Sequence, residues 1–195
     1  MLIVISGPSG AGKGTIIKEV LKRKPEIIYS VSYTTRPKRD GENNGKDYFF
    51  ISKERFEEMV KNGEFLEWAK VYDYYYGTSK EFVLKKLREG KDVILEIEIQ
   101  GARKVREVFD RKNTIFIFIA PPSFKELKKR IEKRRRGETE EEIKKRLNFA
   151  KEEMKEAEKY DYIVINDDVN RAVEEVLCII NREKGGEDFE ENKLR

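Results

Sequence analysis

The segment Gly7-Pro-Ser-Gly-Ala-Gly-Lys13-Gly-Thr15 follows directly on the apolar residues 2–6 and carries the strongest structural signal in the sequence. An apolar run, a glycine-rich turn and then a lysine predict a buried strand, a tight loop and a helix. Glycines let backbone N–H groups converge on an anion, and the positive end of the following helix points at the same place. The lysine adds a mobile charge for the outer phosphates of a polyphosphate. The segment therefore predicts a phosphate-binding loop.

The loop departs from the strict phosphate-loop pattern at one position. That pattern places Ser or Thr immediately after the lysine, where this chain has Gly14 and the hydroxyl follows at Thr15. The shift leaves two roles open for Thr15, either a magnesium ligand or a contact to a phosphate. A glycine-rich turn without a ligand is the alternative, and it accounts for neither the three glycines around a lysine nor Thr15.

Composition limits the classes of function. The chain has 195 residues and no histidine, so imidazole catalysis and histidine metal sites are excluded. The net charge of +4 is too small for a nucleic-acid coat. We expect the single cysteine, Cys178, to be a buried thiol, because it lies in an apolar run. No apolar run approaches the roughly 20 residues that span a bilayer. These features predict a cytoplasmic protein without a membrane or nucleic-acid partner.

Apolar runs alternate with helical patterns along most of the chain. We expect strands at residues 2–6, 27–33, 93–99, 114–120 and 162–166. Helices are expected at residues 13–24, 100–110, 123–135, 139–160 and 170–183. Continuous apolar runs are typical of parallel strands covered on both faces. The alternation predicts an α/β fold, a three-layer core around a central five-stranded parallel sheet.

Two segments interrupt this alternation. Residues 34–90 are rich in aromatic side chains and turn signals, which predict an inserted mixed α/β subdomain. Residues 125–136 carry eight basic and two acidic side chains, which predict a basic helical lid. The expected division is a core of residues 1–33, 91–124 and 147–184, a subdomain of 34–90, a lid of 125–146 and a flexible tail of 185–195.

Further motifs resemble one family. They are Ser30-Val-Ser32-Tyr-Thr-Thr-Arg36-Pro-Lys-Arg39, the following segment to Tyr48, Glu67-Trp68, Tyr75-Tyr76-Gly77-Thr78, Glu96-Ile-Glu98-Ile-Gln100-Gly101, Ala120-Pro-Pro-Ser123 and Ile165-Asn166-Asp167. Together with the phosphate loop, and in this order, they resemble guanylate kinase, a family with the P-loop NTPase core. The resemblance implies Mg²⁺-dependent, in-line transfer of the γ-phosphoryl group from ATP to GMP, without a covalent intermediate, with dGMP as a further acceptor. It also implies that the subdomain of residues 34–90 binds GMP.

The resemblance assigns roles to individual residues. The ATP-binding residues would be Gly7, Pro8, Ser9, Gly10, Ala11, Gly12, Lys13, Gly14, Thr15 and Asn166. The GMP-binding residues would be Ser32, Arg36, Arg39, Tyr48, Glu67, Tyr76, Thr78 and Glu98. The catalytic residues would be Lys13, Arg36, Arg39, Arg130, Arg134 and Arg146, and the magnesium contacts Thr15 and Glu96. Which of the three consecutive arginines 134–136 contacts a phosphate stays open.

The assigned residues fit the chemistry of guanine. Its N1 and N2 donors call for carboxylates, here Glu67 and Glu98, and its O6 acceptor calls for hydroxyls, here Ser32 and Thr78. Adenine reverses the pattern at N1 and the 6-position, and it would leave buried polar groups unpaired. The family usually has Asp where this chain has Glu98, whose side chain is one methylene longer. Glu98 could therefore contact guanine either directly or through water. We expect Glu96 and Glu98 to share one face of a strand.

Two alternatives compete with an enzyme of this family. A non-catalytic interaction module of the same fold typically lacks the loop lysine or the lid arginines, and Lys13 and the arginines are present here. A kinase for a different acceptor is disfavoured by Ser32, Glu67 and Thr78.

Overall fold

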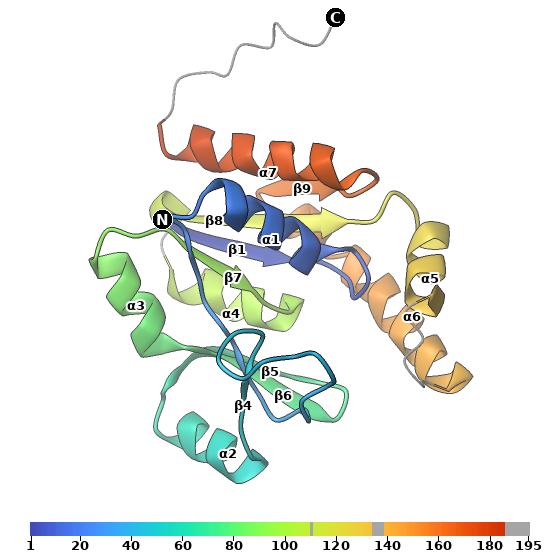
Figure 1. The fold of residues 1–195 in the computed structure, drawn as a ribbon, viewed down its shortest axis with the longest axis horizontal. Helices are drawn as coiled ribbons and strands as arrows, with labels where there is room; N and C mark the ends of the chain where they lie inside the picture. Colours follow the sequence, from blue (N-terminus) through green and yellow to red (C-terminus); the bar gives the residue numbers. More distant parts are fainter. Residues whose placement is uncertain (110, 134–138, 186–195) are drawn as a thin grey trace, which may run out of the picture. The chain divides into compact units, whose positions relative to one another are not determined.

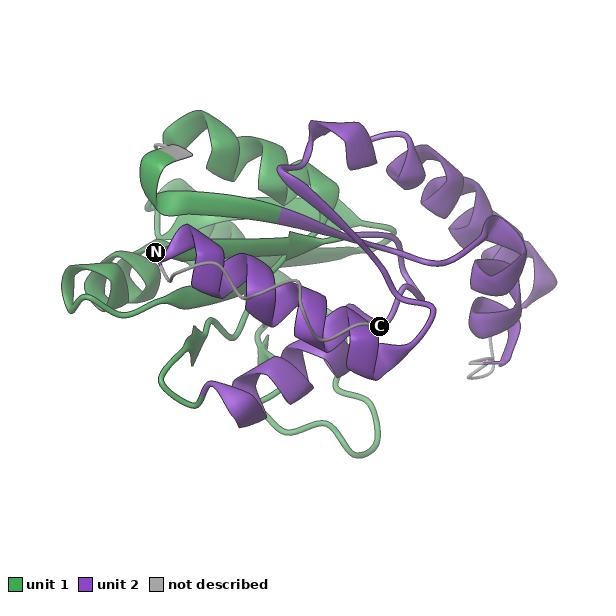
Figure 2. Cartoon of the chain, turned by 90° about the horizontal axis from the view of Figure 1, so that it is seen from above, with its two compact units in different colours: residues 1–6, 25–116 green, residues 7–24, 117–195 purple. Residues whose placement is uncertain are grey.

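The computed structural model describes residues 1–109, 111–133 and 139–185. Its contacts divide the chain into two compact units (Figure 2). Unit 1 comprises residues 1–6 and 25–116, and unit 2 comprises residues 7–24 together with the described part of 117–195. No helix in the described ranges combines the length and apolar composition needed to cross a membrane.

The parallel strands follow the order β2-β7-β1-β8-β9, which confirms the predicted five-stranded sheet. Figure 1 labels β7, β1, β8 and β9 of this sheet. In unit 1, β7 (Val93–Glu96) pairs in parallel with both β1 (Leu2–Ser6) and β2 (Ile28–Tyr29). In unit 2, the end of β8 (Thr114–Ala120) pairs in parallel with β9 (Tyr162–Ile165). Every residue of β1 and β8 is buried, as continuous apolar strands require.

Unit 1 also contains a second, mixed sheet in the order β4-β3-β6-β5. Its strands are β3 (Tyr33–Thr34), β4 (Phe49–Phe50), β5 (Phe65–Val71) and β6 (Tyr74–Ser79), of which β5 and β6 form an antiparallel hairpin. The helices of this unit are α2 (Lys53–Lys61), α3 (Lys80–Arg88) and α4 (Ile99–Val108), with a 3₁₀ turn at Arg111–Asn113. Phe56, Met59 and Phe65 form the local core between α2 and the hairpin.

The described part of unit 2 is mainly helical, apart from β9 and the end of β8. It contains α1 (Lys13–Arg23), α5 (Phe124–Lys133), α6 (Glu140–Met154), a 3₁₀ turn (Ala157–Lys159) and α7 (Val169–Glu183). Helices α5 and α6 pack on each other through Leu127, Ile131, Ile143 and Ala150. The N-terminus of α6 has a capping box, in which Thr139 and Glu142 satisfy each other's backbone N–H groups.

Several predicted boundaries were wrong. The expected strand at 27–33 is divided, because the chain leaves the first sheet after Ser30 and enters the second at Tyr33. The expected strand at 93–99 ends at Glu96, so Glu98 lies at the N-cap of α4 and does not share a strand with Glu96. The expected helix at 139–160 ends at Met154. Cys178 is exposed. The division into core, subdomain, lid and tail stays a prediction, and residues 186–195 of the tail lie outside the described residues.

Candidate active site

The phosphate loop connects the end of β1 to the start of α1, as predicted. Gly12 caps α1 with a φ of 96°, in the left-handed region that glycine adopts without strain. At Gly7, a Cβ atom would overlap the carbonyl oxygen of Ile119. The loop therefore requires glycine at both positions, for its backbone conformation and for close packing.

Two cationic side chains of unit 2 lie on this loop. Lys13 donates from Nζ to the carbonyl oxygen of Gly7 at 2.5 Å, so its ammonium group folds back over the turn. Arg146, from α6, donates from Nη2 to Oγ of Ser9 at 2.9 Å. The structure thus brings two of the predicted catalytic residues to the predicted anion site.

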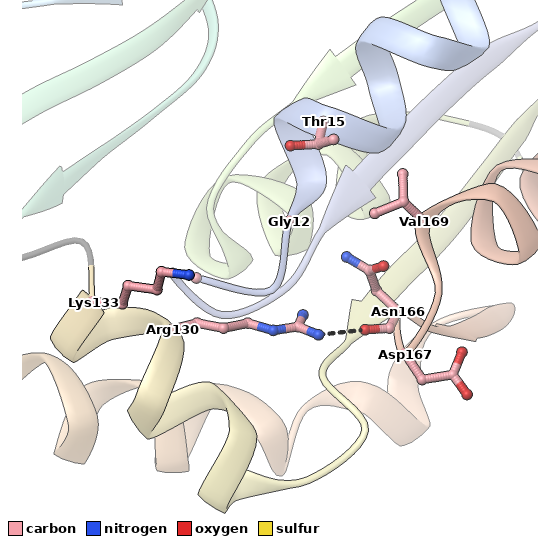
Figure 3. Close-up of a pocket in the computed structure, with 8 residues that line it drawn as sticks. Gly12, Thr15, Arg130, Lys133, Asn166, Asp167 and Val169 are labelled. Carbon is pink, nitrogen blue, oxygen red and sulfur yellow. Dashed lines mark hydrogen bonds between the residues drawn. The ribbon is translucent and has the colours of Figure 1, made fainter.

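A pocket of about 310 Å³ opens beside the loop, a size at the lower end of ligand pockets (Figure 3). Its lining residues are Gly10, Gly12, Thr15, Arg130, Lys133, Asn166, Asp167 and Val169. Lys133, Asp167 and Val169 were not predicted as site residues. Nothing in the local pattern distinguishes one lysine in a basic helix or one valine at a helix start, and Asp167 was noted only as part of the Ile165-Asn166-Asp167 motif.

The predicted lid arginines are only partly described. Arg130 donates from Nη2 to the carbonyl oxygen of Asn166 at 3.0 Å (Figure 3). Its Nε donates to Glu126 at 3.2 Å. Arg134 was predicted to be catalytic, and it lies outside the described residues with Arg135 and Arg136. The structure places Arg130 at the pocket wall, where it is bound to protein groups.

The predicted guanine-binding residues lie in unit 1. Glu67 on β5 and Thr78 on β6 are 5% and 0% exposed, and Oγ1 of Thr78 donates to Oε1 of Glu67 at 2.6 Å. Burial raises the pKa of Glu67 to about 7, although the hydrogen bond from Thr78 and the positive charge of Lys104 oppose the shift. A buried carboxylate that titrates near neutral pH is an expected feature of a binding or catalytic site.

Helix α4 supplies the surroundings of Glu67. A Cβ atom on Gly101 would overlap Oε2 of Glu67, so only glycine leaves room for the carboxylate. Lys104 donates from Nζ to the carbonyl oxygen of Trp68 and lies 4.3 Å from the centroid of the Trp68 ring. Sequence reasoning assigned no role to Lys104, since its partner lies 36 residues away in the chain. The negative charge of Glu98, at the N-cap, opposes ionisation of Glu67.

The predicted acceptor-phosphate residues gather around an acid that the sequence did not reveal. Glu42 accepts from Nη2 of Arg36 at 2.7 Å and from the backbone N–H of Arg39 at 2.8 Å. Burial is the largest single influence on Arg36 and would lower its pKa. The hydrogen bond to Glu42, the charge of Glu42 and the interactions with Tyr76 together outweigh burial and raise the pKa. The Arg36 guanidinium also lies 5.5 Å from the ring centroid of Tyr48, whose ring meets that of Tyr76 edge-on. Arg39 itself is exposed.

The remaining predictions concern Ser32 and the magnesium contacts. Ser32 is buried, 7% exposed. Glu96 is half-buried and accepts a hydrogen bond from the Tyr29 hydroxyl at 3.3 Å. In the part of the chain that the structure describes, no three His, Cys, Asp or Glu side chains form a group that could hold a metal ion. The exposed Thr15 hydroxyl lines the pocket. A single hydroxyl beside the phosphate loop fits a Mg²⁺ ion that is coordinated mainly by substrate phosphates and water.

Comparison with known proteins decides the family. The family model described as guanylate kinase matches residues 1–183. The chain belongs to the guanylate kinase family. It is 59% identical to the guanylate kinase of Caldanaerobacter subterraneus subsp. tengcongensis, over 94% of this chain and 88% of that one. It is 51% identical to the guanylate kinase of Thermotoga maritima, over 94% and 87% of the two chains.

A solved structure confirms the guanylate kinase fold. The crystal structure of guanylate kinase from Anaplasma phagocytophilum matches with a TM-score of 0.79 at 33% identity, over 94% of this chain and 85% of that one. The predicted P-loop core is thereby confirmed, and so is the prediction of an enzyme of this family.

Proposed function

We propose that this chain binds ATP at the phosphate loop and its adjoining pocket and GMP at the Glu67–Thr78 site, and that it transfers the γ-phosphoryl group between them. The activity itself, ATP:GMP phosphotransfer with release of ADP and GDP, is that of the guanylate kinase family to which the chain belongs. The observation that carries the residue assignment is the buried carboxylate of Glu67 paired with a hydroxyl.

The acceptor base is recognised by its hydrogen-bonding edge. Glu67 would accept from N1 and N2 of guanine, with Glu98 as a second acceptor directly or through water, and Thr78 and Ser32 would donate to O6. Adenine would set an N1 lone pair against the carboxylate, and unpaired buried groups of this kind can cost roughly 10⁴-fold in selectivity. dGMP carries the same base and phosphate, so we propose it as a further acceptor.

The acceptor phosphate requires cationic and hydroxyl donors. The Arg36 guanidinium can bind a phosphate at two points, and Arg39, Tyr48 and Tyr76 would add further donors. In the structure, Glu42 accepts hydrogen bonds from the Arg36 guanidinium and from the Arg39 backbone N–H. The acceptor phosphate would therefore share these donors with a carboxylate that is already in place.

Catalysis in this proposal consists of positioning and neutralising charge. The nucleophile is a phosphate oxygen, so no general base is needed and the absence of histidine is no obstacle. Lys13 would stabilise the charge on the β- and γ-phosphates, and Arg146 and the lid arginines would stabilise the transferring group in an in-line displacement. When bound, Mg²⁺ would add charge neutralisation on the phosphates, and Thr15 and Glu96 are the residues proposed to contact it or its water.

Replacing Lys13 tests whether the phosphate loop contributes to turnover without contributing to GMP binding. In Lys13→Ala we expect kcat to fall by about three orders of magnitude or more, while GMP binding survives. GMP binding can be followed by the fluorescence of Trp68, the single tryptophan, which directly follows Glu67. Near-normal turnover in this variant would contradict the assignment of Lys13.

A further inference from the structure

The side chain of Asn166 is already engaged by the phosphate loop. Asn166 follows β9 and is 3% exposed, and its Nδ2 donates to the carbonyl oxygen of Ala11 at 2.6 Å. Chemistry fixes the orientation of the amide, because the reverse orientation would set its oxygen against the Ala11 oxygen. The amide nitrogen therefore holds the loop backbone.

Gly12 has no side chain, and this leaves room for the same amide group. A Cβ atom on Gly12 would overlap Nδ2 of Asn166. The carbonyl oxygen of Gly12 accepts the first hydrogen bonds of α1, from the N–H groups of Thr15 and Ile16, both at 3.1 Å. Asn166 thus packs on the residue from which the helix starts, directly before Lys13.

The backbone of Asn166 is anchored on both sides. Its N–H donates to the carbonyl oxygen of Ala120 at 2.8 Å, and its carbonyl oxygen accepts from Arg130 (Figure 3). A side chain on a backbone held at two points is a rigid support for a loop. Its Oδ1 atom is buried and has no hydrogen-bond partner among the described residues, which leaves that atom to a ligand or water.

We propose that Asn166 is a positioning residue that holds Ala11 and Gly12 in the conformation in which the loop binds phosphate. The family resemblance implies that Asn166 contacts ATP directly. The proposed role differs from such a contact, for example one to the base, because it acts on any polyphosphate that the loop binds. The inference rests on the proposed ATP site.

Inorganic tripolyphosphate tests the proposal, since it has neither base nor ribose. The assay measures its inhibition constant against ATP at saturating GMP, together with KM for ATP and for GMP, in Asn166→Ala. We expect the tripolyphosphate inhibition constant and KM for ATP to rise by the same factor, about tenfold, with KM for GMP unchanged. Asn166→Ser, whose side chain is too short to reach Ala11, should raise both constants by a similar factor. It provides a second variant if Asn166→Ala folds poorly.

A destabilised control separates positioning from general loss of stability. Val176 on α7 is fully buried in the same unit, so Val176→Ala should lower Tm while leaving the tripolyphosphate inhibition constant at its wild-type value. A rise in KM for ATP with unchanged tripolyphosphate inhibition would identify a base contact and overturn the proposal. Unchanged values for both ligands would also overturn it. If tripolyphosphate fails to compete with ATP in the wild type, the loop assignment itself is wrong, and the inference fails with it.

Discussion

Thr78 donates its hydroxyl hydrogen to Glu67, with 2.6 Å between Oγ1 and Oε1, and both side chains are buried. A hydroxyl has one hydrogen to donate, so Thr78 cannot serve Glu67 and guanine O6 at the same time. Binding of guanine would therefore redirect this hydrogen to O6 while N1–H and N2–H replace it at the carboxylate. The site without guanine is thus preorganised, because Thr78 and Glu67, the two residues proposed to bind the base, are hydrogen-bonded to each other in its absence.

The ionisation of Glu67 predicts a pH dependence of acceptor binding. Burial raises the pKa of Glu67 to about 7, and only the carboxylate accepts from both N1 and N2 of guanine. We expect kcat/KM for GMP to rise about tenfold per pH unit below pH 7 and to level off above it. The phosphate of GMP titrates in a similar range, so Glu67→Gln is the control, and its profile should lack the part due to the carboxylate. Identical profiles for the two proteins would contradict the role of Glu67.

Lys104 tunes this ionisation. Its positive charge lowers the pKa of Glu67, so in Lys104→Met the pKa should rise and the midpoint of the pH profile should move to higher pH. The variant should lose activity at pH 7 and recover it at pH 9. Lys70 provides a matched control on β5, because its ammonium lies over Tyr75 and Lys70→Met should leave the midpoint unchanged. An unmoved midpoint in Lys104→Met would show that Lys104 only packs on Trp68.

We predict that GMP binding requires glycine at position 101. A methyl group there would overlap Oε2 of Glu67, so Gly101→Ala should raise KM for GMP by about tenfold or more and leave KM for ATP unchanged. Alanine is favoured over glycine inside a helix, so this change should not come from a loss of helix stability.

A second variant isolates this contact. Glu67→Asp shortens the side chain, so in the Gly101→Ala background it should cost much less GMP affinity than it does alone. Additive effects of the two substitutions would exclude a direct clash.

The pair of Arg36 and Glu42 predicts a pH-dependent contribution to stability. Burial is the largest single influence on Glu42 and would raise its pKa, but the hydrogen bonds from Arg36 and the Arg39 backbone, together with the positive charges of both arginines, outweigh it and lower the pKa. The stabilising effect of Glu42 is therefore present above pH 4.5 and is lost as pH falls through the lower folded-state pKa. We expect Glu42→Gln to reduce the free energy of unfolding by about 2 kcal/mol at pH 7. Urea denaturation at pH 7 and pH 4 measures the difference, which should shrink at pH 4.

The exposed pair of Lys53 and Glu57 provides the control for this measurement. Glu57→Gln should change stability little at either pH, since exposed pairs contribute less than about 1 kcal/mol. An effect of Glu42→Gln no larger than that of Glu57→Gln would contradict the importance of the Arg36 pair.

The sequence predicted features that depend on local chemistry. The phosphate loop, the start of α1 at Lys13 and the buried strands β1 and β8 follow from glycine geometry and continuous apolar runs. Where a strand leaves one sheet for another, as between Ser30 and Tyr33, the apolar pattern does not change, so the pattern alone predicted one strand.

Side-chain pairings were beyond sequence reasoning. The contact of Lys104 with Trp68 joins segments far apart in the chain, and the pairing of Glu42 with Arg36 depends on a turn whose shape no motif specifies. Glu98 was expected on a strand with Glu96, but the strand ends and a helix begins between them, which the alternation of acidic and apolar residues does not reveal.

The most direct test offers the wild-type protein four acceptors with ATP and Mg²⁺ and measures ADP release with GMP, AMP, CMP and UMP in turn. The account predicts turnover with GMP, and a kcat/KM for GMP that exceeds that for AMP by roughly 10⁴-fold. Comparable turnover with AMP or a pyrimidine nucleotide, or no ADP release with GMP, would contradict it.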